Sequence, residues 1–233
     1  DCLLNLQQPD GLLASQGLNQ SMYDHGIATV MLCECYGMLD NARQARARVA
    51  IAHAVRLILD AQSVPKSSGD RGGWRYMPRS RDSDISVSGW QLMALRGAAN
   101  AGAAVPKSAI DAGIAYIKRQ AAEDGAFRYG PSGHETLATT GTGILALELL
   151  GQNGAPEAVA GGDYLMKTPL GGVHSQFYFY TVYYCSQAAY QLGGRYWAAL
   201  NPEIRHSILQ RQRPNGSWSV SETNEQQGGD AYD

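Results

Sequence analysis

The stretch Gln212-Arg213-Pro214-Asn215-Gly216-Ser217-Trp218 is the most informative part of this 233-residue chain for its fold. A helical pattern ends in Gln212 and is followed by a turn and then by an aromatic residue. Asn215 and Gly216 tolerate the positive φ angles that end a helix. Trp218 is placed to pack back onto the helix ends. The stretch therefore predicts a turn that joins one helix hairpin to the next.

Related stretches recur along the chain and predict a repeat. The other copies are Gln7 to Leu13, an enlarged turn from Gln62 to Gly72-Gly73-Trp74, Gln120 to Phe127 with one extra residue, and a degenerate copy at Pro169-Leu170-Gly171-Gly172. Their spacing is about 45 to 60 residues, which is typical of solenoid proteins.

Two kinds of helix are expected to alternate around these turns. Apolar helices rich in small residues are predicted over residues 26–39, 86–101, 137–150 and 177–192. Amphipathic helices with charged stripes are predicted over 42–62, 107–120, 155–167 and 202–212. A helix that is apolar all round is buried, whereas an amphipathic helix faces solvent. We therefore predict an inner and an outer layer of helices. No strands are predicted, because β-branched residues do not alternate with polar ones over a long run.

The Gln-x-x-x-Gly-x-Trp stretch resembles the QW motif of squalene–hopene and oxidosqualene cyclases. More broadly, the repeat resembles the prenyltransferase and squalene-cyclase superfamily over almost the whole chain. The resemblance implies an all-α fold, an α/α toroid of repeated helix hairpins with two concentric helix layers. It says little about chemistry, because one fold can host many functions.

In such a toroid the inner helices begin at one rim of a central cavity, where their positive dipole ends converge. We therefore expect the candidate ligand-binding residues at these helix starts and along the inner helices. They are Tyr23, Asp24, His25, Trp90, His134, Glu135, Tyr178 and Tyr180. Asp230 is expected to begin a further inner helix.

Asp82-Ser83-Asp84-Ile85-Ser86 allows two interpretations. It resembles the Asp-x-Asp-Asp-Thr acid motif of class II cyclases, which implies that Asp84 is the acid that protonates an alkene and that Asp82 assists it. Ile85 replaces the last Asp of that motif. Alternatively, Asp82 and Asp84 cap an inner helix. A cap predicts a lowered pKa for Asp84, whereas a desolvated acid predicts a raised one. We favour the cap.

A zinc site is not expected. Protein prenyltransferase β subunits use an Asp-x-Cys pair and a later His, and the chain has no Asp-x-Cys. The helix around Phe179 to Cys185 resembles their His-bearing helix, but Tyr180 stands where the His would be. A different cluster of Asp24, His25, His134 and Glu135 is the remaining metal alternative. We predict neither metal nor cofactor.

Composition limits the partners. The net charge of -2 gives no reason to expect nucleic acid as a partner, and no apolar run is long enough for a transmembrane segment. The four cysteines lie in apolar helical stretches and are expected to be buried thiols, which weakly favours the cytoplasm.

The favoured function is a binding or scaffolding module that takes an apolar small molecule or a peptide segment. The alternative is a cyclase-like enzyme that uses Asp84 as a general acid on an isoprenoid. Asp1 falls inside an expected outer helix, and the chain ends at the entry to an expected inner one. We therefore expect residues 1–233 to form a single toroid domain cut from a longer chain, or to self-associate through uncovered apolar faces.

Overall fold

The computed structural model describes residues 1–15, 19–171 and 177–218. The chain divides into two compact units: the first comprises Asp1–Gln120 and Arg128–His134, and the second comprises Ala121–Phe127 and Glu135–Asp233. Within the described ranges all regular structure is helical, and β pairing is limited to three isolated bridges. The all-α prediction is thereby confirmed.

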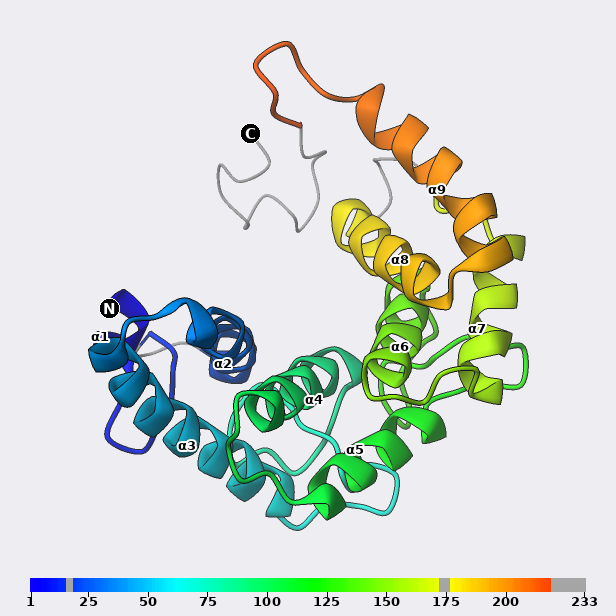
Figure 1. The fold of residues 1–233 in the computed structure, drawn as a ribbon. Coiled ribbons are helices and arrows are strands. Elements are labelled where there is room, and N and C mark those ends of the chain that lie inside the picture. The colour runs from blue at the N-terminus through cyan, green and yellow to red at the C-terminus, as the bar shows by residue number, and fades with distance from the viewer. Residues whose placement is uncertain (16–18, 172–176, 219–233) are drawn as a thin grey trace. The chain divides into compact units, whose positions relative to one another are not determined.

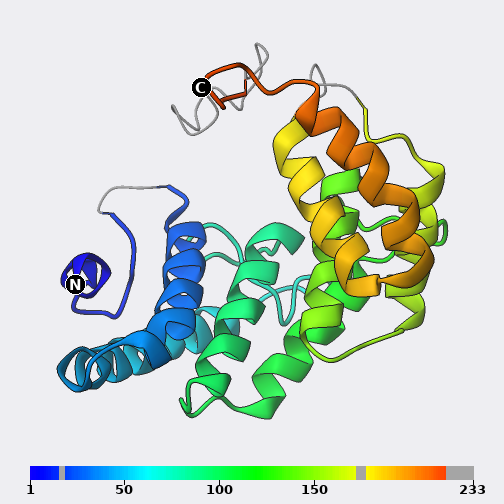
Figure 2. The ribbon, with the colours of Figure 1, turned by 45° about the horizontal axis from the view of Figure 1, so that its top comes forward.

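The first unit contains two layers of helices (Figure 1). Its helices are α1 (Cys2–Leu6), α2 (Ser21–Cys35), the short 3-10 helix η1 (Tyr36–Met38), α3 (Asn41–Ser63), α4 (Ile85–Asn100) and α5 (Lys107–Arg119). Helices α2 and α4 pack side by side, while α3 and α5 form the second layer beside them (Figures 1 and 2). The buried side of α4 is lined by apolar and small residues such as Val87, Leu92 and Leu95.

The second unit has the same arrangement of helix pairs. Its helices are α6 (Leu137–Leu149), α7 (Pro156–Lys167), α8 (Tyr178–Leu192) and α9 (Gly194–Leu209). Helices α6 and α8 pack closely, because Gly141 has no side chain: a Cβ there would lie 2.7 Å from the backbone of Tyr184. Helices α7 and α9 flank this pair (Figure 1).

The connecting turns share one geometry. A glycine follows each of four helices with φ near +90°, at Gly11, Gly72, Gly125 and Gly216. In three of these turns the amide of the preceding Gln donates a hydrogen bond to the glycine carbonyl, over 3.0 Å from Gln7, 2.8 Å from Gln62 and 2.8 Å from Gln212. The Gln therefore closes the turn that the positive-φ glycine opens.

The aromatic residues after the turns hold the helix ends. The indole of Trp74 is buried and donates a hydrogen bond to the carbonyl of Ile58 over 2.8 Å. Trp218 makes the equivalent bond to Ile208 over 2.9 Å, and Phe127 is fully buried. These aromatic residues thus pack at the hairpin junctions, as the sequence predicts.

Two predicted helix starts are wrong. Helix α2 begins at Ser21 and not at residue 26, because Met22, His25 and Thr29 pack along one buried face. Helix α9 begins at Gly194 and not at residue 202, directly after the positive-φ residue Gly193 that ends α8.

Pro202 lies inside α9 without ending it. The proline is exposed. Three buried residues spaced four apart, Tyr196, Leu200 and Ile204, hold the helix across it. The predicted entry to a further inner helix near Asp230, and part of the degenerate turn at Gly172, lie outside the described residues.

The cysteines differ in part from the prediction. Cys33 and Cys185 are buried, and burial raises their pKa values to about 11 and about 12. Cys35 is half-buried, whereas Cys2 is exposed, because the short helix α1 leaves it facing solvent. None of the helices in the described ranges has the length and apolar character needed to cross a membrane.

Candidate functional site

Asp84 is the N-cap of helix α4 in the first unit. Its backbone is extended, with φ -132° and ψ 158°, and its side-chain Oδ1 accepts a hydrogen bond from the Val87 N–H over 2.9 Å. The Asp84 N–H donates to the carbonyl of Trp74 over 2.9 Å, which ties the cap to the preceding turn. The side chain is fully buried. The predicted capping contact is therefore present.

Arg75 links Asp84 to three other side chains. Its guanidinium lies 2.9 Å from Asp84 Oδ2 and 3.1 Å from Asp82 Oδ2, and it donates to the hydroxyl of Tyr129 over 2.8 Å. It also stacks over the ring of Tyr76, 4.1 Å from the ring centroid. One buried and one exposed carboxylate thus share a single cation.

Tyrosines surround this ion pair. The hydroxyls of Tyr76 and Tyr129 are hydrogen-bonded to each other. The ring of Tyr23, in the first turn of α2, lies 5.9 Å from that of Tyr76. Sequence reasoning placed Tyr23, Asp82 and Asp84 at one rim, and the structure gathers these three in one cluster. It missed Arg75, Tyr76 and Tyr129, because the turn that holds Arg75 carries an insertion and Tyr129 is distant in sequence.

Burial decides the charge state of Asp84. Loss of solvent raises the pKa of Asp84 to about 6, although the Val87 N–H and Arg75 both favour the charged form. The expectation that a cap lowers this pKa is therefore wrong in direction. The cap geometry is right, but the carboxyl is buried so deeply that desolvation outweighs the hydrogen bonds from Val87, Arg75 and Ser86. Asp84 is a buried acid that titrates near pH 6.

His25 is a packing residue. It is fully buried in α2, with Nδ1 accepting from the Leu13 N–H over 2.9 Å and Nε2 lying 3.2 Å from the carbonyl of Ala54. Burial lowers its pKa to about 4, so the ring is neutral. His25 was expected among the candidate ligand-binding residues at the rim. Both of its nitrogens are instead used to fasten the first turn to α3.

The remaining predicted residues are spread over both units. In the first unit Trp90 is half-buried on α4, and His134 is exposed, with its carbonyl accepting from the Tyr129 N–H. In the second unit Glu135 is exposed, Tyr178 is buried and hydrogen-bonded to Ser207, and Tyr180 packs edge-on against Tyr184 with ring centroids 4.7 Å apart.

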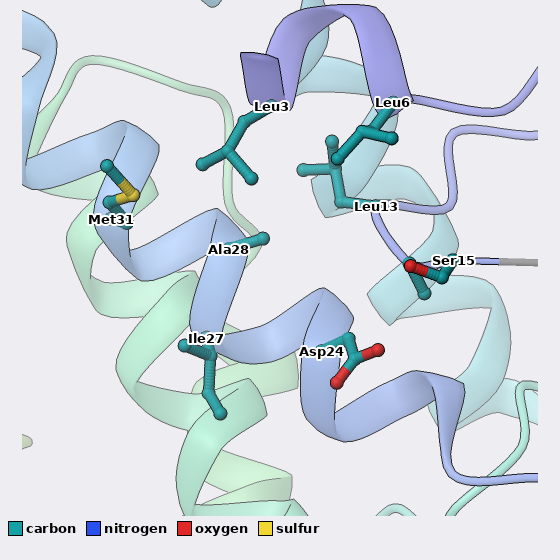
Figure 3. Close-up of a pocket in the computed structure, with 9 residues that line it drawn as sticks. Leu3, Leu6, Leu13, Ser15, Asp24, Ile27, Ala28 and Met31 are labelled. Atoms are coloured by element: carbon teal, nitrogen blue, oxygen red, sulfur yellow. The ribbon is translucent and has the colours of Figure 1, made fainter. Parts of the chain in front are cut away.

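Asp24 lies in an apolar groove that the sequence did not predict (Figure 3). The groove has a volume of about 300 Å3 and runs between α1, the segment after the first turn, and α2. Its lining residues are Leu3, Leu6, Leu13, Ala14, Ser15, Asp24, Ile27, Ala28 and Met31. The α2 residues of this set are spaced three and four apart, which is the pattern of one helical face.

The groove has an apolar end and a polar end. Leu3 and Met31 lie at one end, and Asp24 and Ser15 lie at the other (Figure 3). The relative solvent exposure is 48% for Leu6, 44% for Ile27 and 53% for Met31, which is high for large apolar side chains. This arrangement suits an elongated, largely apolar molecule.

No group of three or more His, Cys, Asp or Glu residues that could hold a metal ion occurs within residues 1–15, 19–171 and 177–218. In the alternative cluster of Asp24, His25, His134 and Glu135, His25 is not available as a metal ligand, because both of its ring nitrogens contact the backbone.

No protein-family model matches the sequence, and no curated protein matches it. Among solved structures, the chain is similar to the type II terpene cyclase MstE from Scytonema (apo), with a TM-score of 0.45 and 17% identity over 93% of this chain and 78% of that chain. A variant of MstE in complex with its substrate geranylgeranyl dihydroxybenzoate matches with a TM-score of 0.46 and 15% identity, over 93% and 77%. A second variant of MstE, in complex with the product merosterolic acid A, matches with a TM-score of 0.41 and 18% identity, over 93% of this chain and 79% of that chain. Identities this low assign no residue role in this chain.

Proposed function

We propose that this chain is a binding module for an apolar ligand, which lies in the groove between α1 and α2. The observation that carries the proposal is the row of half-exposed large side chains, Leu6, Ile27 and Met31, along a hollow of about 300 Å3. That volume is at the lower end of the range of ligand pockets, roughly 300–1,000 Å3. Covering each of these side chains contributes about 1 kcal/mol, since full burial of such a residue contributes roughly 1.5–3 kcal/mol.

Binding of decanol, a neutral apolar probe, tests the proposal. We expect isothermal titration to show saturable binding that Met31→Asp weakens at least about tenfold, because a carboxylate in the apolar end must be desolvated when the ligand binds. Met38→Asp is the matched control: it introduces the same carboxylate at a methionine that is 85% exposed and does not line the groove. Equal loss in both variants, or none in either, would show that the groove is not the site. Native mass spectrometry of the purified chain identifies what it retains.

One observation favours a second candidate, acid catalysis by Asp84 on an isoprenoid. The carboxyl is fully buried and its pKa is raised to about 6, so about a tenth of it is protonated at pH 7. Against this candidate, both carboxyl oxygens are engaged, one by the Val87 N–H and one by Arg75. Proton delivery therefore requires the Arg75 contact to open. The groove residues also do not include Asp84.

Incubation with squalene, followed by gas chromatography and mass spectrometry of the products, tests this second candidate. Cyclised products from wild type that disappear in Asp84→Asn would support it. The control is Asp111→Asn, which removes an exposed carboxylate on α5 that pairs with Lys107. Persistence of product in Asp84→Asn would rule out Asp84 as the acid.

A further inference from the structure

We infer that the ligand of the α1–α2 groove is a cationic amphiphile, an apolar chain that ends in an ammonium group held by Asp24. This inference rests on the proposed function and specifies its ligand. Asp24 is the one charged residue among the described residues that line the groove. Its carboxylate lies at the polar end, beside Ser15 (Figure 3).

The Asp24 carboxylate has no protein partner in the described part of the chain. No hydrogen bond or ion pair involves its side chain there. Two other carboxylates of the first unit have protein partners: Asp1 pairs with Arg43 and Arg46, and Asp10 accepts from the Leu12 N–H. Asp24 is therefore a half-buried negative charge whose partner must come from solvent or from a ligand.

The chemistry of the head group follows from this charge. A neutral hydroxyl head would displace several waters from the carboxylate and return only one hydrogen bond, without the opposite charge, which costs free energy. An anionic head would be repelled. An ammonium supplies both the opposite charge and hydrogen-bond donors. The Ser15 hydroxyl at the same end can accept a further hydrogen bond from it.

The geometry of α2 fixes how the ligand lies. Asp24, Ile27, Ala28 and Met31 are on one face of the helix, so the axial distance from Asp24 to Met31 is about 10 Å at ~1.5 Å per residue. An ammonium at Asp24 thus places an alkyl chain along Ile27 and Ala28 towards Met31 and Leu3 (Figure 3).

A matched pair of probes, decylamine and decanol, tests the inference by isothermal titration below their micelle concentrations. Wild type should bind decylamine about fivefold more tightly at low ionic strength, which corresponds to a partly exposed ion pair of about 1 kcal/mol. Asp24→Asn should abolish this preference, because it removes the carboxylate that pairs with the ammonium, and decanol should bind the variant at least as tightly as it binds wild type. The control Glu34→Gln removes one negative charge from an exposed site on the same helix and should keep the preference.

The other outcomes separate the two proposals. Equal affinity for both probes in wild type would overturn the cationic head group and leave the apolar groove in place. Binding of neither probe would overturn the proposed function itself. Sedimentation that shows a dimer disrupted by Met31→Asp would show that a second copy, and not an amphiphile, occupies the groove. Circular dichroism of each variant establishes that the helices are retained.

Discussion

The buried Asp84 carboxyl should make the stability of the protein depend on pH in a specific direction. Its pKa rises from 3.8 to about 6 on folding, so the folded state binds a proton more tightly than the unfolded state does. The stabilisation by this proton is fully present below pH 3.8 and is lost as pH rises through about 6. This rise in the pKa corresponds to about 3 kcal/mol of unfolding free energy.

Asp84→Asn isolates this contribution. Asparagine is a good N-cap and cannot ionise, so the capping contact with Val87 can persist. We expect the difference in unfolding free energy, wild type minus variant, to fall by about 2.4 kcal/mol between about pH 4 and about pH 7. Because the variant retains His25 and every other titrating group, their contributions cancel in the difference.

Urea denaturation followed by circular dichroism at several pH values provides the measurement. Asp82→Asn is the companion variant: it removes the exposed carboxylate that shares Arg75 and so reports the effect of losing one ion pair with this guanidinium. A difference that stays flat, or that rises with pH, would refute the reasoning. It would mean that Arg75 and the Val87 N–H outweigh desolvation.

Three further substitutions, the first with a matched control, test packing and burial. Gly72→Ala should destabilise the protein by roughly 2–4 kcal/mol in chemical denaturation, because φ is +91° and the new Cβ would overlap the carbonyl oxygen of Ala112. The control Gly37→Ala has open space around it and should change stability by less than about 0.5 kcal/mol. The His25 pKa is lowered to about 4, so the unfolding free energy of wild type should fall by about 3 kcal/mol relative to that of His25→Gln as pH falls from about 7 to about 4. If the unfolding free energies of the two proteins instead change with pH in parallel, the ring is not buried and neutral. Thr140→Val should cost about 1–3 kcal/mol in thermal or urea unfolding, because it leaves the buried Phe127 N–H without its 3.0 Å acceptor, and an unchanged midpoint would contradict this.

Local signals in the sequence predicted most of the fold. The start of α5 at Lys107 and the end of α8 at Leu192 coincide with their predicted positions. Helix caps and positive-φ glycines depend on contacts within a few residues, so short stretches of sequence are enough to predict them. The start of α9 was missed because a buried face holds the helix together across Pro202, which by local preference should begin or break it.

The site depended on tertiary structure. The sequence alone favoured Asp84 as a helix cap over an acid, and the cap contact with Val87, which spans only three residues, is present. It could not determine the charge state, since the pKa depends on how completely distant segments bury the carboxyl and on the guanidinium of Arg75 beside it. The groove at Asp24 likewise exists only where α1 and the segment after the first turn line a hollow beside α2. Burial and charge at a site are set by residues that are remote in sequence, so only the packed chain decides them.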